Sequence, residues 1–85
     1  MLESVKLAIP VKTNYYDNEL TELIADAYSD LSLVGIDVSR NDPLIKRAVI
    51  TYCKMHFGNP GNYDDLKASY DEQKAQMISA TGYGL

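Results

Sequence analysis

The alternation of apolar and polar side chains is clearest between residues 17 and 33. Apolar residues recur there at the i, i+3, i+4 and i+7 spacing of a helix with one buried face: Leu20, Leu23, Ile24, Ala27, Tyr28 and Leu31. Acidic residues share the opposite face, which we call the acidic stripe: Glu19, Glu22, Asp26 and Asp30. The pattern predicts a long amphipathic helix with one face on the core.

The segment between residues 42 and 58 carries a start signal and a stop signal for a second helix. Asp42 can cap the N-terminus, and Pro43 suits the first turn, where its missing N–H would have no partner. Gly58 suits the left-handed residue that follows many helices. The residues between these signals are apolar on most of the circumference, so we expect other elements to pack around this helix.

The faces of this central helix differ in chemistry. One stripe is apolar or aromatic, with further apolar residues beside it: Ile45, Val49, Tyr52 and His56, flanked by Leu44, Ala48 and Met55. The narrow remaining side is mainly basic and has Lys46 next to it: Arg47, Ile50 and Lys54. Ile50 is an apolar residue among charges, so we expect this side to face water or a partner.

Two shorter patterns flank these helices. Leu2, Val5 and Ile9 fit a short amphipathic helix that Pro10 ends, although an edge strand over residues 5–11 is the alternative. The pattern of residues 63–79 predicts a last helix that is polar around most of its surface and packs on one side only. Its possible cap is Asn62, and its weak apolar stripe is Leu66, Tyr70, Gln73 and Met77.

These patterns together predict an all-α fold, a small bundle of about four helices with short connections. We expect residues 1–79 to form one helical domain and residues 80–85 to form a flexible, Gly-rich C-terminal tail.

Composition and charge exclude several classes of protein. Cys53 is the only cysteine, so no internal disulfide is possible, which fits a reducing compartment. No run approaches the roughly 20 apolar residues of a membrane span, and nothing resembles a signal peptide, so we expect no membrane association. The net charge of −4 argues against a protein that binds DNA by neutralising phosphates.

Candidate chemistry is sparse, and we predict no catalytic residue, no metal site and no cofactor. Cys53 and His56 could share a helix face, but structural zinc needs four ligands and no further cysteine or histidine is present. We therefore interpret both as packing or helix-end residues. The acidic stripe could bind a divalent cation, but a solvated helix face is the ordinary explanation.

Seven tyrosines against one phenylalanine and no tryptophan is an unusual balance. Tyrosine is amphipathic and enriched at protein interfaces. We expect Tyr28, Tyr52 and Tyr70 to be half-buried in the core because they lie on helix stripes. The remaining tyrosines lie at helix ends or in connections, and are candidates for contacts with other proteins: Tyr15, Tyr16, Tyr63 and Tyr83.

The succession of patterns resembles a known family. The strongest part of the resemblance combines three segments: the end of the central helix at residues 52–58, residues 66–70 of the last helix, and the Thr-Gly-Tyr of residues 81–83. The N-terminal layout, a short helix, a polar linker and a long amphipathic helix, is similar too. Taken over nearly its whole length, the chain resembles the small head–tail connector proteins of tailed bacteriophages, also described as DNA-packaging connectors.

The resemblance implies structural work and no enzymatic activity. Proteins of this family are α-helical and assemble as rings of about a dozen copies beneath the portal protein. The ring extends the DNA channel, so DNA passes through without sequence-specific binding, and it supports the downstream head-closure or tail protein. The implied location is the head–tail junction of the virion, after assembly in the host bacterial cytoplasm, for a phage or a prophage.

Within such a ring, two different surfaces of each copy must match. Candidate subunit-interface residues are those of the acidic stripe and the narrow side of the central helix: Glu19, Glu22, Asp26, Asp30, Arg47, Ile50 and Lys54. The four candidate tyrosines would then contact the portal or the next protein. The alternative function is a small helical DNA-binding or regulatory protein, against which the acidic composition counts.

Overall fold

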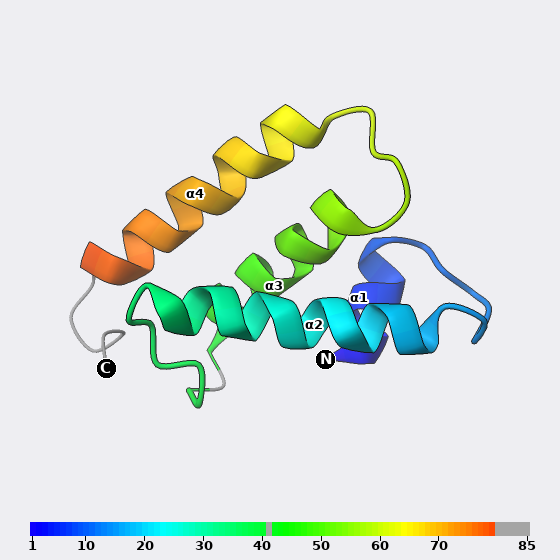
Figure 1. The fold of residues 1–85 in the computed structure, drawn as a ribbon, viewed down its shortest axis with the longest axis horizontal. Coiled ribbons are helices and arrows are strands. Elements are labelled where there is room, and N and C mark those ends of the chain that lie inside the picture. Colours follow the sequence, from blue (N-terminus) through cyan, green and yellow to red (C-terminus); the bar gives the residue numbers. More distant parts are fainter. Residues whose placement is uncertain (41, 80–85) are drawn as a thin grey trace.

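Four α-helices joined by short connections make up the fold (Figure 1). We describe a computed structural model of the chain, which covers residues 1–40 and 42–79. The helices are α1 (Leu2–Ala8), α2 (Asp17–Leu33), α3 (Pro43–His56) and α4 (Tyr63–Ser79). No strand occurs in the part of the chain that the structure describes, so the predicted all-α bundle is confirmed.

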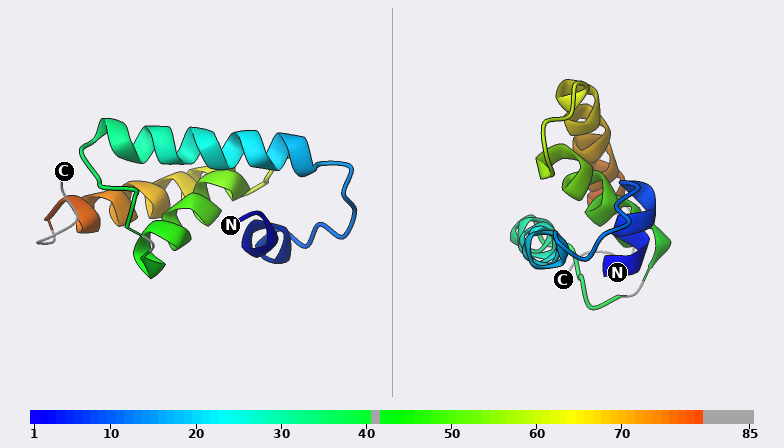
Figure 2. Two further views of the ribbon diagram at one scale, coloured as in Figure 1. Left: turned by 90° about the horizontal axis from the view of Figure 1, so that it is seen from below. Right: turned by 90° about the vertical axis from the view of Figure 1, so that its right-hand side faces the viewer.

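Helix α3 lies at the centre of the bundle and contacts each of the other three helices. The end-on view of Figure 2 shows α1, α2 and α4 arranged around it. Its buried residues lie on several of its faces: Ile45, Ala48, Val49, Thr51, Cys53 and Met55. The prediction of a central helix is confirmed, because three neighbours can cover a helix that is apolar on most sides.

The ends of α3 follow the signals in the sequence. The Asp42 carboxylate accepts a hydrogen bond of 2.8 Å from the backbone N–H of Leu44, an N-terminal donor that has no partner within the helix. Pro43 occupies the first turn. Gly58 has a φ of +71°, a left-handed conformation that glycine adopts without a steric penalty from Cβ. Local chemistry therefore sets both limits of α3.

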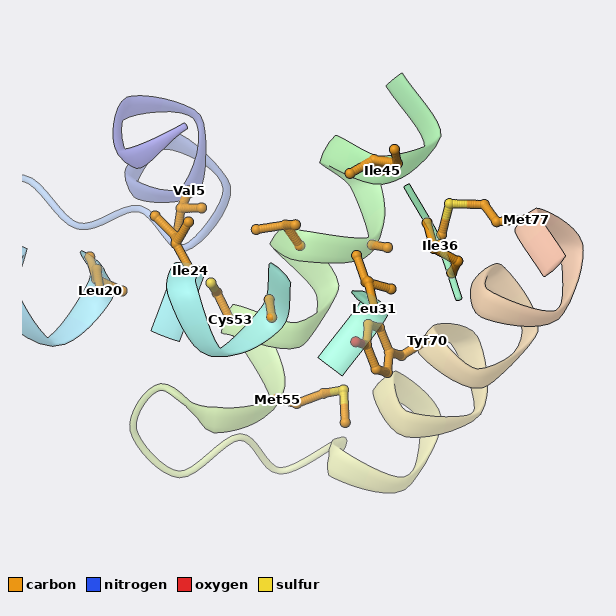
Figure 3. Close-up of a cluster of buried hydrophobic side chains, with 13 residues drawn as sticks. Val5, Leu20, Ile24, Leu31, Ile36, Ile45, Cys53, Met55, Tyr70 and Met77 are labelled. Carbon is orange, nitrogen blue, oxygen red and sulfur yellow. The ribbon is translucent and has the colours of Figure 1, made fainter. Parts of the chain in front are cut away.

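Helix α2 presents its predicted apolar face to the core. Leu20, Ala27 and Leu31 are fully buried and Ile24 is nearly so, while Leu23 and Tyr28 flank them and are half-buried. Leu20, Ile24 and Leu31 appear with Cys53 of α3 among the core side chains of Figure 3. The period of the sequence thus identified the buried face of α2 correctly.

The N-terminal segment is a helix and not the alternative edge strand. Val5 is its fully buried residue, and α1 packs against both α2 and α3. The Lys6 ammonium forms an ion pair with Asp17 at 2.8 Å and donates a hydrogen bond to Asn14 at 2.9 Å. These contacts join α1 to the start of α2.

Helix α4 packs mainly against α3, on one side, as its weak apolar stripe predicts. Only Tyr70 and Met77 of this helix are buried. In Figure 3 the Met77 side chain lies next to Ile36, a fully buried residue of the connection between α2 and α3. Few residues of α4 are therefore buried, although its contact with the central helix α3 is the most extensive between any two helices.

Candidate assembly surfaces

Glu19, Glu22 and Asp26 are exposed on the side of α2 that faces away from the core. None of the three forms an ion pair or a hydrogen bond with another side chain in the described ranges 1–40 and 42–79. We call these three residues the acidic face. Its charges are free to interact with another molecule.

Asp30, the fourth residue of the predicted acidic stripe, is engaged within the chain. One of its carboxylate oxygens accepts a hydrogen bond from the Tyr70 hydroxyl at 2.6 Å and one from the Lys74 ammonium at 3.3 Å. The Lys74 ammonium also lies 4.7 Å from the centroid of the Tyr70 ring. Asp30 therefore joins the end of α2 to the middle of α4, and differs in this from the acidic face.

Burial and hydrogen bonds together shift the pKa values of Asp30 and Tyr70. Burial by itself would raise the pKa of Asp30, but the hydrogen bonds from Tyr70 and Lys74 outweigh it and hold that pKa below its ordinary value. Burial, together with the hydrogen bond to Asp30, raises the pKa of Tyr70. At neutral pH Asp30 is consequently a carboxylate that accepts and Tyr70 is a neutral phenol that donates.

The basic side of α3 is exposed at Lys46, Arg47 and Lys54. We call these three residues the basic face. Within the described part of the chain no carboxylate pairs with any of them. Ile50, which we expect to face water or a partner, is half-buried: it packs partly against the hydrophobic core and keeps part of its side chain exposed. The three neighbours of α3 cover more of its circumference than the sequence pattern indicates.

Two of the candidate tyrosines, directly before α2, form an aromatic row with Phe57. Tyr15 is 83% exposed and Tyr16 is 40% exposed. Their ring centroids are 4.9 Å apart, and the Tyr16 ring lies 5.3 Å from that of Phe57, both pairs in edge-to-face geometry. Tyr15 has most of its surface available for a partner.

The other tyrosines divide as follows. Tyr63, at the start of α4, is 38% exposed, with its ring 6.2 Å from that of His56. Tyr83 lies outside the described residues. Tyr52 is half-buried and contacts the buried Tyr70 edge to face at 5.5 Å, so the expected core role of these two tyrosines is confirmed.

Cys53 and His56 do not come together as a reactive pair. Cys53 is fully buried, and desolvation raises the pKa of its thiol to about 11. His56, the last residue of α3, is exposed and stacks on Tyr52 of the same stripe at 4.4 Å, as a helix-end residue does. Residues 1–40 and 42–79 contain no group of three or more His, Cys, Asp or Glu side chains that could hold a metal ion. None of their helices is long and apolar enough to cross a membrane.

The sequence did not reveal an apolar groove between the ends of α1 and α3 and the start of α4. The groove has a volume of about 310 Å³ and is lined mainly by Ile9, Pro10, Phe57, Pro60 and Leu66, with Lys54 at its polar side. Its residues come from three separate segments of the chain. No local pattern marks them as one surface, because only tertiary packing brings them together.

Comparison with known proteins gives one informative result. A family model described as phage connector protein matches residues 1–84, almost the full sequence. No curated protein and no solved structure matches the chain significantly. The match covers all four helices and both charged faces.

Proposed function

The chain belongs to the phage connector protein family, and we propose that it joins head to tail as a ring below the portal of a tailed bacteriophage or prophage. The family supports a structural role in the phage particle. In this proposal the partners are other copies of the chain, the portal protein, and a head-closure or tail protein. The site of action is the head–tail junction, with assembly in the host cytoplasm and no catalytic step.

The observation that carries the ring proposal is the presence of two oppositely charged faces without partners in the described chain. A ring contact is heterologous, so each copy must offer two different surfaces. The acidic face lies on α2 and the basic face on α3, and each is turned away from the core. We assign the acidic face of one copy to the basic face of the next, because complementary charge fixes both the partner and the orientation.

Ile50 and Asp30 enter this proposal with altered roles. Ile50 is half-buried beside the basic face, so it supports α3 and offers a partner only part of its side chain. Asp30 is bound to Tyr70 and Lys74, so its contribution to an interface would be through the position of α4.

Contacts above and below the ring are proposed for the exposed tyrosines. Tyr15, Tyr16 and Tyr63 have ring surface available to the portal or to the next protein. Tyr83, outside the described residues, belongs to the same proposal. The net charge of −4 also suits a channel that DNA crosses without adhering, because acidic surfaces repel phosphate.

Charge reversal tests the ring contact. We expect Arg47→Glu with Lys54→Glu to abolish ring formation, since each pair of like charges would then repel across the contact. Glu22→Lys with Asp26→Lys is expected to do the same. All four substitutions in one chain exchange the signs of charge between the acidic face and the basic face, and are expected to restore assembly. Native mass spectrometry and negative-stain imaging, with and without the portal protein, measure the outcome.

A matched control makes the result specific. Lys12→Glu with Lys67→Glu changes the net charge equally at exposed positions outside both faces, and we expect rings to persist, because the exposed Lys67–Asp71 ion pair that this variant removes contributes little to stability. Rings that persist in the Arg47 and Lys54 variant would refute this interface. No ring and no portal complex for the unaltered chain under any condition would refute the proposed function. Retarded DNA migration at low salt would favour the DNA-binding alternative.

A further inference from the structure

The groove beside Phe57 is an apolar surface that no part of the described chain fills. Its lining residues Ile9, Phe57, Pro60 and Leu66 are only half-buried. The volume of about 310 Å³ is at the small end of the range for ligand pockets, which suits one or two side chains of a peptide. The Lys54 ammonium at its side has no hydrogen-bond partner among residues 1–40 and 42–79, and can donate to a carbonyl or phenol oxygen.

The sequence after α4 has the chemistry that this groove accepts. Residues 80–85 read Ala-Thr-Gly-Tyr-Gly-Leu, so one tyrosine stands between two glycines. Glycines on both sides let a backbone approach a surface closely, because they carry no Cβ. A tyrosine ring supplies a large apolar area and a phenol oxygen in one side chain.

The tail of the same chain cannot place Tyr83 in this groove. Leu66 is the groove residue on α4, and from there to Ser79 the helix rises about 20 Å. The backbone from Ser79 to Tyr83 spans at most about 14 Å. The rest of the groove lies beyond Leu66, on α1 and at the end of α3, and Figure 1 shows these elements far from the C-terminal end of α4.

We propose that the groove binds the C-terminal segment of a neighbouring copy, with the Tyr83 ring seated against Ile9, Phe57 and Leu66. The proposal rests on ring assembly, because an assembly holds a neighbour's tail close to the groove. The contact is heterologous: the end of one chain meets a surface at the other end of the next. It adds to the charged contact and depends on it, because a reach of about 14 Å from Ser79 requires the charged contact to bring the groove of the next copy near the end of α4.

A peptide titration tests the binding site directly. The full chain carrying Tyr83→Ala, labelled with ¹⁵N, is titrated with an unlabelled peptide of residues 79–85. We expect saturable shifts of the amides of Ile9, Phe57 and Leu66. A peptide with Tyr83→Ala is expected to bind at least about tenfold more weakly, because it lacks the buried ring.

Two protein variants serve as test and control. Ile9→Lys in the groove is expected to weaken peptide binding at least about tenfold, while Leu33→Lys, at an exposed apolar residue of α2, is expected to leave it unchanged. Circular dichroism confirms that both variants are folded. No saturable shift, shifts centred on Leu33 and Ile78, or equal binding of the alanine peptide would overturn the proposal.

A photocrosslinking experiment tests the contact in the assembly. Benzoylphenylalanine replaces Tyr83, and ¹⁴N and ¹⁵N chains are mixed before assembly so that mass spectrometry separates links within a chain from links between chains. We expect mixed-isotope links to the peptides that contain Ile9 or Phe57. Rings that form with links only to the portal, or only within one chain, would overturn this inference and leave the proposed function intact.

Discussion

Removing the hydroxyl of Tyr70 tests most directly whether its contact with Asp30 holds α4 against α2. Tyr70→Phe removes the 2.6 Å hydrogen bond to Asp30 and keeps the ring, which is 3% exposed. A hydrogen bond to a charged group contributes about 1.5–3 kcal/mol, and the Asp30 side chain is 36% exposed, so water replaces part of it. We expect the free energy of unfolding to fall by about 1 kcal/mol. Urea denaturation followed by circular dichroism measures it, and the melting temperature is expected to fall by about 4–8 °C.

Tyr63→Phe is the matched control, because Tyr63 is also on α4 but is 38% exposed and its hydroxyl has no hydrogen bond to a described residue. We expect a change within about 0.5 kcal/mol, as for most surface substitutions. Tyr70→Ala removes the ring as well and is expected to cost about 3–5 kcal/mol. Equal stabilities of Tyr70→Phe and Tyr63→Phe would refute the idea that the Asp30 contact holds α4.

The effect of Tyr70→Phe also depends on pH. The pKa of Asp30 is lowered in the folded chain relative to its ordinary value of 3.8. A lowered carboxyl pKa contributes stability that is present above the unfolded value and is lost as pH falls through the folded value. We therefore expect the stability difference between the unaltered chain and Tyr70→Phe to be largest at neutral pH and to shrink below pH 3.8. A difference that grows on acidification would contradict this.

Three further predictions concern α3 and its ends. Asp42→Ala removes the 2.8 Å cap on Leu44 and is expected to cost about 1 kcal/mol in urea denaturation; Asp42→Asn, which retains a capping oxygen, is expected to cost less. Gly58→Ala places a Cβ at a φ of +71° and is expected to cost about 1–2 kcal/mol, whereas Gly61→Ala, with open space and no positive φ, is expected to change stability little. Cys53 is fully buried with a thiol pKa of about 11, so we expect a thiol reagent at neutral pH to modify it only at the rate of unfolding; fast modification of the folded chain would show that the core opens there.

Local signals were sufficient for the secondary structure. The apolar period of α2 and the chemistry at both ends of α3 lie within short windows of the chain, and the helices begin and end close to the predicted residues. The all-α class followed, because each segment had helical spacing. The resemblance to head–tail connectors also depended on the order of these segments, and the family match over residues 1–84 confirms it.

The spacing of residues along a helix could not show which residues of one face form contacts within the chain. Asp30 has the same spacing as Glu19, Glu22 and Asp26, yet α4 returns to that point of α2 and engages only Asp30. The exposure of Ile50, which is half-buried, and of His56, which is exposed, could not be read from the sequence pattern for a related reason. A residue on α3 is buried only where a neighbouring helix packs over it. The residues of α3 alone do not show where α1 and α4 pack.

The sequence by itself determined four helices, a central α3, two charged faces and membership of a connector family, because these depend on local spacing and on residue order. Only the tertiary structure decided which charges are used within the chain and which are left for a partner. It also created the groove of Ile9, Phe57 and Leu66, whose residues are distant in sequence. The physical reason is that exposure depends on packing between segments.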